Sequence, residues 1–213
     1  MRKLLSLIAV VTAALTAPVA HAALITTLYN TGVDASGTVL PNGTVGDPHY
    51  SLISVPGGTT ATRIITSASG FPIPPYIGDN TSSRWIGPDA AQLNGPVGNY
   101  TFRTTFDLTG LDFTTAHIAG GWSSDNNGVD ILINGTSLGY TTNFAQFQLG
   151  FSAFSVNSGF VAGVNTLDFV VFNGGGPTAL RVEMTGTVPE PGSLALVALA
   201  LVGLGLAARR RQR

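Results

Sequence analysis

Apolar and polar residues alternate along the middle of this chain, and this two-residue period restricts the fold more than any other feature. Within residues 100–108, Tyr100, Phe102 and Phe106 fall on one side of the chain. Arg103 falls on the other side. Such alternation is typical of a β-strand with one buried face. No stretch between the two ends of the chain has the period of an amphipathic helix, so the body is predicted to be all-β.

Turn signals separate further short strands. The pair Asn134-Gly135 lies between residues 129–133 and 136–140 and is the strongest short-range signal for a β-hairpin. Residues 165–172 form a nearly continuous apolar run, which predicts a central strand covered on both faces. Short strands separated by turns predict an antiparallel β-sandwich, a jelly roll. Other strands are expected at residues 24–29, 50–55, 63–67, 147–156 and 180–184, with a loop or edge at the proline-rich residues 71–77.

Residues 1–22 have the three zones of a secretory signal peptide. Arg2 and Lys3 form a positive start, residues 4–15 form a short apolar helix, and Ala20 and Ala22 form an A-x-A cleavage site. We expect cleavage after Ala22. A retained anchor is the alternative, but it requires a longer apolar run.

The C-terminal residues 188–213 form a second address. The stiff stretch Val188-Pro189-Glu190-Pro191 precedes the apolar residues 193–208. This pattern predicts a transmembrane helix with its basic end in the cytoplasm and the body outside. The basic tail consists of Arg209, Arg210, Arg211 and Arg213.

The motif, the apolar run and the basic tail together resemble the PEP-CTERM sorting signal of Gram-negative bacteria. This resemblance implies processing near the motif by an exosortase, a membrane transpeptidase. It also implies an inner-membrane intermediate, a final place at the cell surface or outside the cell, and an association with extracellular polysaccharide. An ordinary single-pass anchor has the same topology but keeps its helix. The expected domains are a signal peptide (1–22), a β-sandwich (23–187) and a sorting signal (188–213).

The composition excludes several classes of function. The chain has no cysteine, which removes thiol catalysis, disulfides and cysteine-ligated zinc. Residues 23–187 hold four arginines, no lysine and all of the chain's 11 acidic residues except Glu190, a formal charge of −6. Such a surface repels phosphate backbones, so no nucleic-acid partner is expected.

The stretch from Trp85 to Glu183 resembles galactose-binding-like jelly-roll modules, which are common in exported PEP-CTERM proteins and in carbohydrate-binding modules. The features that carry this resemblance are Gly121-Trp122, Asp125-Asn126, residues 129–135, residues 163–169, residues 173–175 and residues 180–182. The resemblance concerns the fold, and a fold does not fix a function.

No catalytic residues are expected, and the chain is not expected to be an enzyme. His49 and His117 lie on separate segments, and no nucleophile elbow, zinc-binding helix or phosphate loop is present. His117 lies in a strand-like stretch, which favours a structural role. The acidic residues could include the carboxylate pair of an unusual glycoside hydrolase, which is one alternative function.

One oxygen-rich cluster has the residue types that calcium prefers. Asp125, Asn127 and Asp130 could supply oxygen ligands to calcium. The favoured interpretation is a tight turn, because Asp, Asn and Gly all favour turn geometry, and the two roles can coexist. No cofactor is therefore expected, with calcium as the alternative.

Three aromatic residues are candidates for stacking on a sugar ring: Tyr76, Trp85 and Trp122. Tyr76 and Trp85 lie in or beside polar, proline-rich loops, where binding residues concentrate. For Trp122, which is followed at once by Ser and Asp, a place at the edge of the core is favoured. The leading hypothesis is a non-catalytic surface or matrix protein associated with extracellular polysaccharide. The alternative is a carbohydrate-binding module. Exposure of Tyr76 and Trp85 on one surface would favour this alternative, and burial of both would argue against it.

Overall fold

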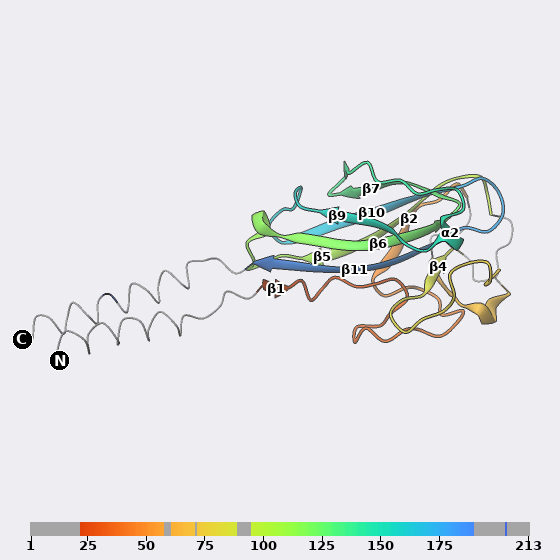
Figure 1. Cartoon of the computed structure of the whole chain (residues 1–213), viewed down its shortest axis with the longest axis horizontal. Helices are drawn as coiled ribbons and strands as arrows, with labels where there is room; N and C mark the ends of the chain where they lie inside the picture. The colour runs from red at the N-terminus through yellow and green to blue at the C-terminus, as the bar shows by residue number, and fades with distance from the viewer. Residues whose placement is uncertain (1–21, 58–60, 71, 89–94, 190–202, 204–213) are drawn as a thin grey trace, which may run out of the picture. The chain divides into compact units, whose positions relative to one another are not determined.

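The computed structural model describes residues 22–57, 61–70, 72–88, 95–189 and 203 (Figure 1). Residues Leu24–Val188 form one compact unit, the body, distinct from the two end segments. The predicted signal helix lies outside the described residues, and so does the predicted transmembrane helix apart from Gly203. Everything that follows therefore concerns the body.

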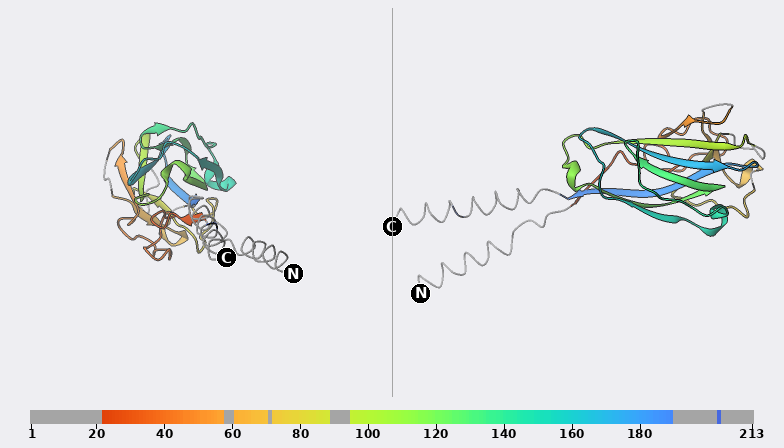
Figure 2. Two further views of the ribbon diagram at one scale, coloured as in Figure 1. Left: turned by 90° about the vertical axis from the view of Figure 1, so that its left-hand side faces the viewer. Right: turned by 90° about the horizontal axis from the view of Figure 1, so that it is seen from above.

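Two antiparallel sheets make up the body (Figure 2). One sheet has six strands in the order β3-β4-β11-β6-β9, with β1 beside β11, and the other has five strands in the order β2-β5-β10-β7-β8. The predicted antiparallel jelly-roll sandwich is confirmed. The strands are β1 (Ala22–Leu24), β2 (Tyr50–Ser54), β3 (Arg63–Ile65), β4 (Trp85–Gly87), β5 (Gly98–Asp107), β6 (His117–Asp125), β7 (Asn127–Ile133), β8 (Thr136–Ser137), β9 (Ser152–Val156), β10 (Val164–Asn173) and β11 (Ala179–Pro189). The short helices are η1 (Ser67–Ser69), η2 (Phe113–Thr115) and α2 (Gln146–Leu149).

The strongest local signals give the expected structures. Asn134 and Gly135 both have positive φ, at 49° and 81°, and connect β7 to β8. Positive φ at both central residues is what a type I′ hairpin requires. Strand β10 is central, as predicted, and pairs with β5 and β7. Its outer face is half-buried rather than covered, because Thr166 and Val170 remain partly exposed.

Two predicted strands are largely wrong. Of residues 24–29, only Leu24 belongs to a strand, and the rest of this segment runs irregularly beside β11. Of residues 147–156, the first part belongs to α2 and only Ser152–Val156 forms a strand. Both stretches are rich in apolar residues, but a short apolar run does not distinguish a strand from a single helical turn.

The main core lies between the two sheets and is rich in aromatic rings. The ring of Trp122 on β6 lies 5.8 Å from that of Phe169 on β10, which joins the two layers. Phe154 on β9 meets the same Phe169 ring edge-on at 5.7 Å. All three side chains are buried, so aromatic contacts account for much of the packing across the sandwich.

Gly128 on β7 packs directly against the Trp122 ring. A methyl group added to Gly128 would come within 2.1 Å of the ring. We expect Gly128→Ala to lower the free energy of unfolding by about 2 kcal/mol, because a buried indole cannot move aside without cost. Urea unfolding measures the change. Gly78→Ala is the matched control, since nothing lies within 4 Å of its added methyl. Equal stability of the two variants would contradict the packing.

A second, smaller cluster lies on the outer face of the six-stranded sheet. Neighbouring strand residues point to opposite faces. On β11, Leu180 belongs to the main core, and Ala179 belongs to the second cluster. On β4, likewise, Ile86 belongs to the main core and Trp85 belongs to the second cluster. The outer face of this sheet is therefore covered by a further layer, which is built from the loops around Tyr76 and α2.

Candidate functional site

The three aromatic residues predicted to stack on sugar are all buried. Trp122 is 0% exposed in the main core. Trp85 is 0% exposed and Tyr76 4% exposed, both in the second cluster. Their rings meet edge-on at 5.2 Å, and the Trp85 Nε1–H donates to the Ile77 carbonyl at 3.0 Å. The prediction of an exposed platform on these residues is wrong, because the proline-rich loop folds its aromatic side chain onto the sheet. For Trp122, the interpretation as a core residue is confirmed.

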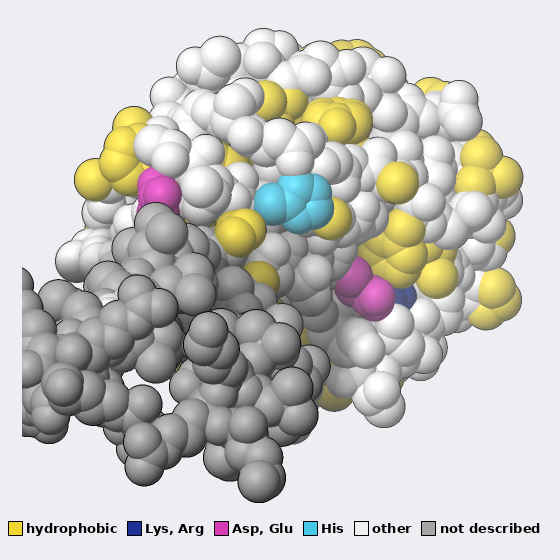
Figure 3. Space-filling view, turned by 60° about the vertical axis from the view of Figure 1, so that its left-hand side comes forward, with side chains coloured by type: hydrophobic (Ala, Val, Ile, Leu, Met, Phe, Trp, Pro, Cys, Tyr) yellow, Lys and Arg dark blue, Asp and Glu magenta, His cyan; other side chains and the backbone are white. Residues whose placement is uncertain are grey.

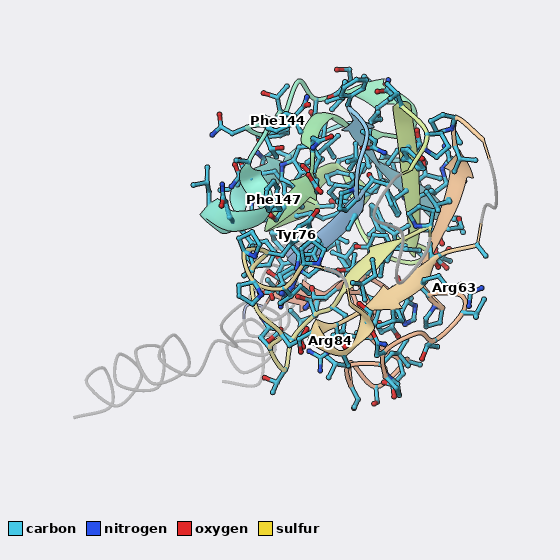
Figure 4. The ribbon with its side chains drawn as sticks, turned by 90° about the vertical axis from the view of Figure 1, so that its right-hand side faces the viewer. Arg63, Tyr76, Arg84, Phe144 and Phe147 are labelled. Atoms are coloured by element: carbon cyan, nitrogen blue, oxygen red, sulfur yellow. The ribbon has the colours of Figure 1, made fainter. Side chains whose placement is uncertain are left out.

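Other apolar side chains are exposed next to this cluster. Phe144, just before α2, is 64% exposed, and Leu149, the last residue of α2, is 62% exposed. Phe147, within α2, is partly exposed. In Figure 4 Phe144, Phe147 and Tyr76 follow one another along one side of the molecule. We call Phe144, Phe147 and Leu149 the α2 platform. The platform could not be predicted from the sequence, because the apolar residues of 147–156 indicate a strand.

Stacking and hydrogen bonds hold the α2 platform in place. The ring of Phe147 stacks on that of Tyr76 at 4.5 Å with an interplanar angle of 29°. The Phe147 carbonyl accepts from the Ile77 N–H at 2.8 Å. The Ser123 hydroxyl on β6 donates to the Gln146 carbonyl at 3.0 Å. The platform is thus attached both to the second cluster and to the sheet, which fixes its orientation before any ligand arrives.

A buried arginine holds the loop that carries Tyr76. Arg181 on β11 is 0% exposed. Its Nε donates to the Ser83 hydroxyl at 2.7 Å, and its Nη1 donates to the Gly78 carbonyl at 2.8 Å. Burial lowers the pKa of Arg181, and the neighbouring Glu183 carboxylate opposes that effect. In the sequence, Arg181 alternates with apolar residues and looks like a solvent-facing position.

Glu183 continues the same hydrogen-bond network. Its Oε1 accepts from the Asn80 amide and from the Ser83 hydroxyl, each at 2.7 Å. The Phe151 ring lies 5.7 Å from the Arg181 guanidinium on the other side. The network therefore connects residues 77–83 to β11, and the second cluster closes beneath that loop.

The calcium candidates lie on two strands of different sheets. Asp125 ends β6 and is buried, and its Oδ1 accepts from the Asn126 amide at 2.9 Å. Asp130, on β7, accepts from the Gly139 N–H at 3.0 Å. Asn127 begins β7. Within the described part of the chain, no group of three or more His, Cys, Asp or Glu residues could hold a metal ion. Calcium binding stays a prediction.

The described acidic residues of the body have structural partners. Asp47, for example, accepts from the backbone N–H groups of Gly32 and Tyr50. Asp168 pairs with Arg103 across β10 and β5, with an Nε–Oδ1 distance of 2.6 Å. The described carboxylates that accept hydrogen bonds are those of Asp34, Asp47, Asp79, Asp107, Asp112, Asp125, Asp130, Asp168 and Glu183.

The two histidines of the body are also used in packing. His49 stacks on Tyr29, with ring centroids 3.6 Å apart. His117 lies on β6, where its Nε2 is 3.2 Å from the Ser155 hydroxyl. The structural role expected of His117 is confirmed.

Comparison with known proteins identifies the C-terminal segment. Residues 187–211 match the model of the PEP-CTERM protein-sorting motif. The chain carries a PEP-CTERM sorting motif. It is therefore an exported, sorted protein of the kind found in Gram-negative bacteria, and it passes through the membrane. No curated protein matches the chain.

Solved structures similar to the chain include three carbohydrate-binding modules of family 35. The module from Paenibacillus barcinonensis is 16% identical, with a TM-score of 0.36, and the match covers 67% of this chain and 98% of that one. The module from Clostridium thermocellum is 9% identical, with a TM-score of 0.33 and coverages of 68% and 90%. A third, from an environmental isolate, is 12% identical, with a TM-score of 0.34 and coverages of 76% and 97%.

The PEP-CTERM motif begins inside the last strand. Val188 is 2% exposed and belongs to the main core, and Pro189 is the first exposed residue of the motif. Glu190 and Pro191 lie outside the described residues. Within the described residues, the structure contains no helix with the length and apolar character needed to cross a membrane. The predicted helix over residues 193–208 lies outside them, apart from Gly203.

Proposed function

We propose that this protein is a non-catalytic component of the cell surface or extracellular matrix that contacts extracellular polysaccharide through the α2 platform. The single observation that carries the proposal is an apolar platform, with Phe144 64% exposed, on a rigid support. Exposed aromatic and aliphatic side chains held in this way favour binding, because little conformational entropy is lost when a ligand arrives. Processing by an exosortase-type enzyme before final placement is part of the same proposal.

The use of the acidic residues supports a non-catalytic role. A glycoside hydrolase uses a pair of carboxyl groups that flank the scissile bond, one as the proton donor and the other as nucleophile or base. In the body, by contrast, the described carboxylates accept hydrogen bonds from turns, strands or arginine. The polar groups around the platform, such as Asn143 and Gln148, are exposed amides. They suit hydrogen bonding to neutral hydroxyl groups.

Binding to the exopolysaccharide of the producing bacterium tests the proposal. Affinity electrophoresis measures the binding of residues 23–188 to the polysaccharide. This fragment keeps the buried Val188. We expect Phe144→Ala to weaken binding about tenfold, since an exposed aromatic anchor is worth about 1.4 kcal/mol when truncated.

Val164→Ala is the matched control, because Val164 is also 64% exposed but begins β10, where it pairs with Asp107 at the end of β5. If Phe144→Ala bound polysaccharide as tightly as the wild type, the α2 platform would not be the binding surface. If the folded wild-type body bound no polysaccharide at all, polysaccharide would not be its ligand, and the proposed function would be wrong.

A further inference from the structure

A groove of about 350 Å³ opens where β11 approaches its end. Its walls are mainly apolar and come from the N-terminal segment of the body and from β11; they include Leu24, Ile25, Leu28, Tyr29 and Met184. The small residues Ala35, Ser36 and Gly37 form one rim. We call this the N-terminal groove. In Figure 3, which brings this end of the body forward, hydrophobic side chains form separate patches on a surface that is mostly backbone and other side chains.

The rim of the N-terminal groove exposes a large apolar side chain. Leu24 is 66% exposed, the highest exposed fraction among the large hydrophobic residues of the described body. The backbone beside it is fixed, because the Ile25 N–H donates to the Gly186 carbonyl at 2.9 Å. Leu24 also lines the groove, so its side chain and the apolar walls form one connected apolar surface that an apolar partner can cover.

The sequence that follows β11 indicates which apolar partner this groove meets. β11 ends at Pro189, three residues after Gly186 of the groove. The apolar run begins at Ser193. Four residues of fully extended chain span at most about 14 Å. While the apolar run is held in the membrane, the end of β11 therefore cannot move farther than that from the lipid surface.

We propose that the N-terminal groove binds the surface of the lipid bilayer, with Leu24 at the headgroup–acyl boundary, for as long as the C-terminal segment remains attached. This inference rests on the membrane intermediate of the proposed function. It adds a second interaction surface to the α2 platform. Docking would hold the start of the PEP-CTERM motif at a fixed height above the membrane.

The charges near the groove predict which lipids it prefers. Asp34 begins the turn that forms the rim, and its pKa is held below the ordinary value by hydrogen bonds from Ser36 and Thr38. The body has no lysine and a formal charge of −6 over residues 23–187. The attraction is therefore apolar, and anionic lipids are expected to weaken it rather than strengthen it.

The absence of native cysteine allows a direct test with single labels. Residues 23–213, the chain that remains after the expected cleavage of the signal peptide, are reconstituted into phosphatidylcholine vesicles with a fluorophore on Ala35→Cys in the rim. A second sample carries it on Val97→Cys, next to the β10–β11 connection at the start of β11. Quenching by lipid-attached nitroxide is compared with quenching by iodide in the water. We expect the label at position 35 to be quenched by the lipid nitroxide at least threefold more strongly than the label at 97.

Leu24→Asp separates docking from simple nearness to the membrane. Because Leu24 is largely exposed, the variant keeps its fold, which circular dichroism checks. We expect lipid quenching at position 35 to fall to the level at position 97, and added phosphatidylserine to lower it in the wild type. Unchanged quenching in Leu24→Asp would overturn the proposal, and so would disulfide-linked dimers of unlabelled Ala35→Cys that bury the groove against a second copy. If the chain washes off the vesicles in carbonate, the membrane intermediate itself is wrong.

Discussion

Replacing Arg181 with methionine is expected to lower the free energy of unfolding by about 3 kcal/mol. The side chain is 0% exposed, and it donates to the Ser83 hydroxyl and to the carbonyls of Ile77 and Gly78. Methionine fills much of the same volume but removes the donor to the Ser83 hydroxyl and the Gly78 carbonyl, whereas the Ile77 carbonyl keeps its hydrogen bond from Trp85. The loop that covers Tyr76 and Trp85 would lose its main connection to β11.

Urea unfolding of residues 23–188, followed by tryptophan fluorescence, measures this loss. Trp85 lies in the cluster beneath the loop, so its emission also reports local opening. Arg63→Met is the control, because Arg63 is a partly exposed residue of β3, and we expect a change within about 0.5 kcal/mol. Packing would dominate over hydrogen bonding at Arg181 if the methionine variant were as stable as the wild type.

The same substitution connects stability to the proposed binding site. Phe147 of the α2 platform stacks on Tyr76, and Tyr76 belongs to the loop that Arg181 holds. Arg181→Met is therefore expected to weaken polysaccharide binding together with stability. Phe144→Ala, by contrast, removes an exposed ring and is expected to change binding alone. The two variants separate the support of the platform from its contact surface.

Local sequence signals account for the strands that were predicted correctly. The alternation around Phe102 and the Asn134-Gly135 pair depend only on near neighbours, because side-chain direction in a strand and positive φ in a turn are local properties. The PEP-CTERM motif was also predictable, since its recognition depends on a linear order of residues. These features required no knowledge of which segments meet in space.

The candidate site could not be predicted in the same way. Alternation along β11 places Arg181 opposite Leu180 and Val182, but it does not reveal that the opposite face is covered as well. That cover comes from residues 77–83 and from α2, which are distant in the sequence. Tyr76 and Trp85 were expected on the surface because they lie near prolines. Only the tertiary contacts place them beneath Phe147.

Asp125 is expected to make the protein less stable as the pH rises from about 4 to about 7. Burial raises the pKa of this carboxyl from its ordinary 3.8 to about 7, partly opposed by the hydrogen bond from Asn126. The unfolded chain therefore ionises Asp125 near pH 4, whereas the folded chain keeps it neutral until about pH 7. The stabilisation is complete below pH 4 and is lost as the pH rises to 7. The free energy of unfolding falls by up to about 1.4 kcal/mol per pH unit, and by about 4 kcal/mol in total.

Asp125→Asn isolates this effect, because the amide stays neutral and its oxygen can still accept from Asn126. Asp47 also has a raised pKa through burial, and it contributes equally to the wild type and to the variant. We expect urea unfolding in EDTA to give a free energy that falls between pH 4 and 7 in the wild type and falls much less in Asp125→Asn. Parallel pH profiles would show that Asp125 ionises normally. The same titration with calcium tests the metal prediction, because a bound cation would favour the ionised carboxylate and reverse the wild-type slope.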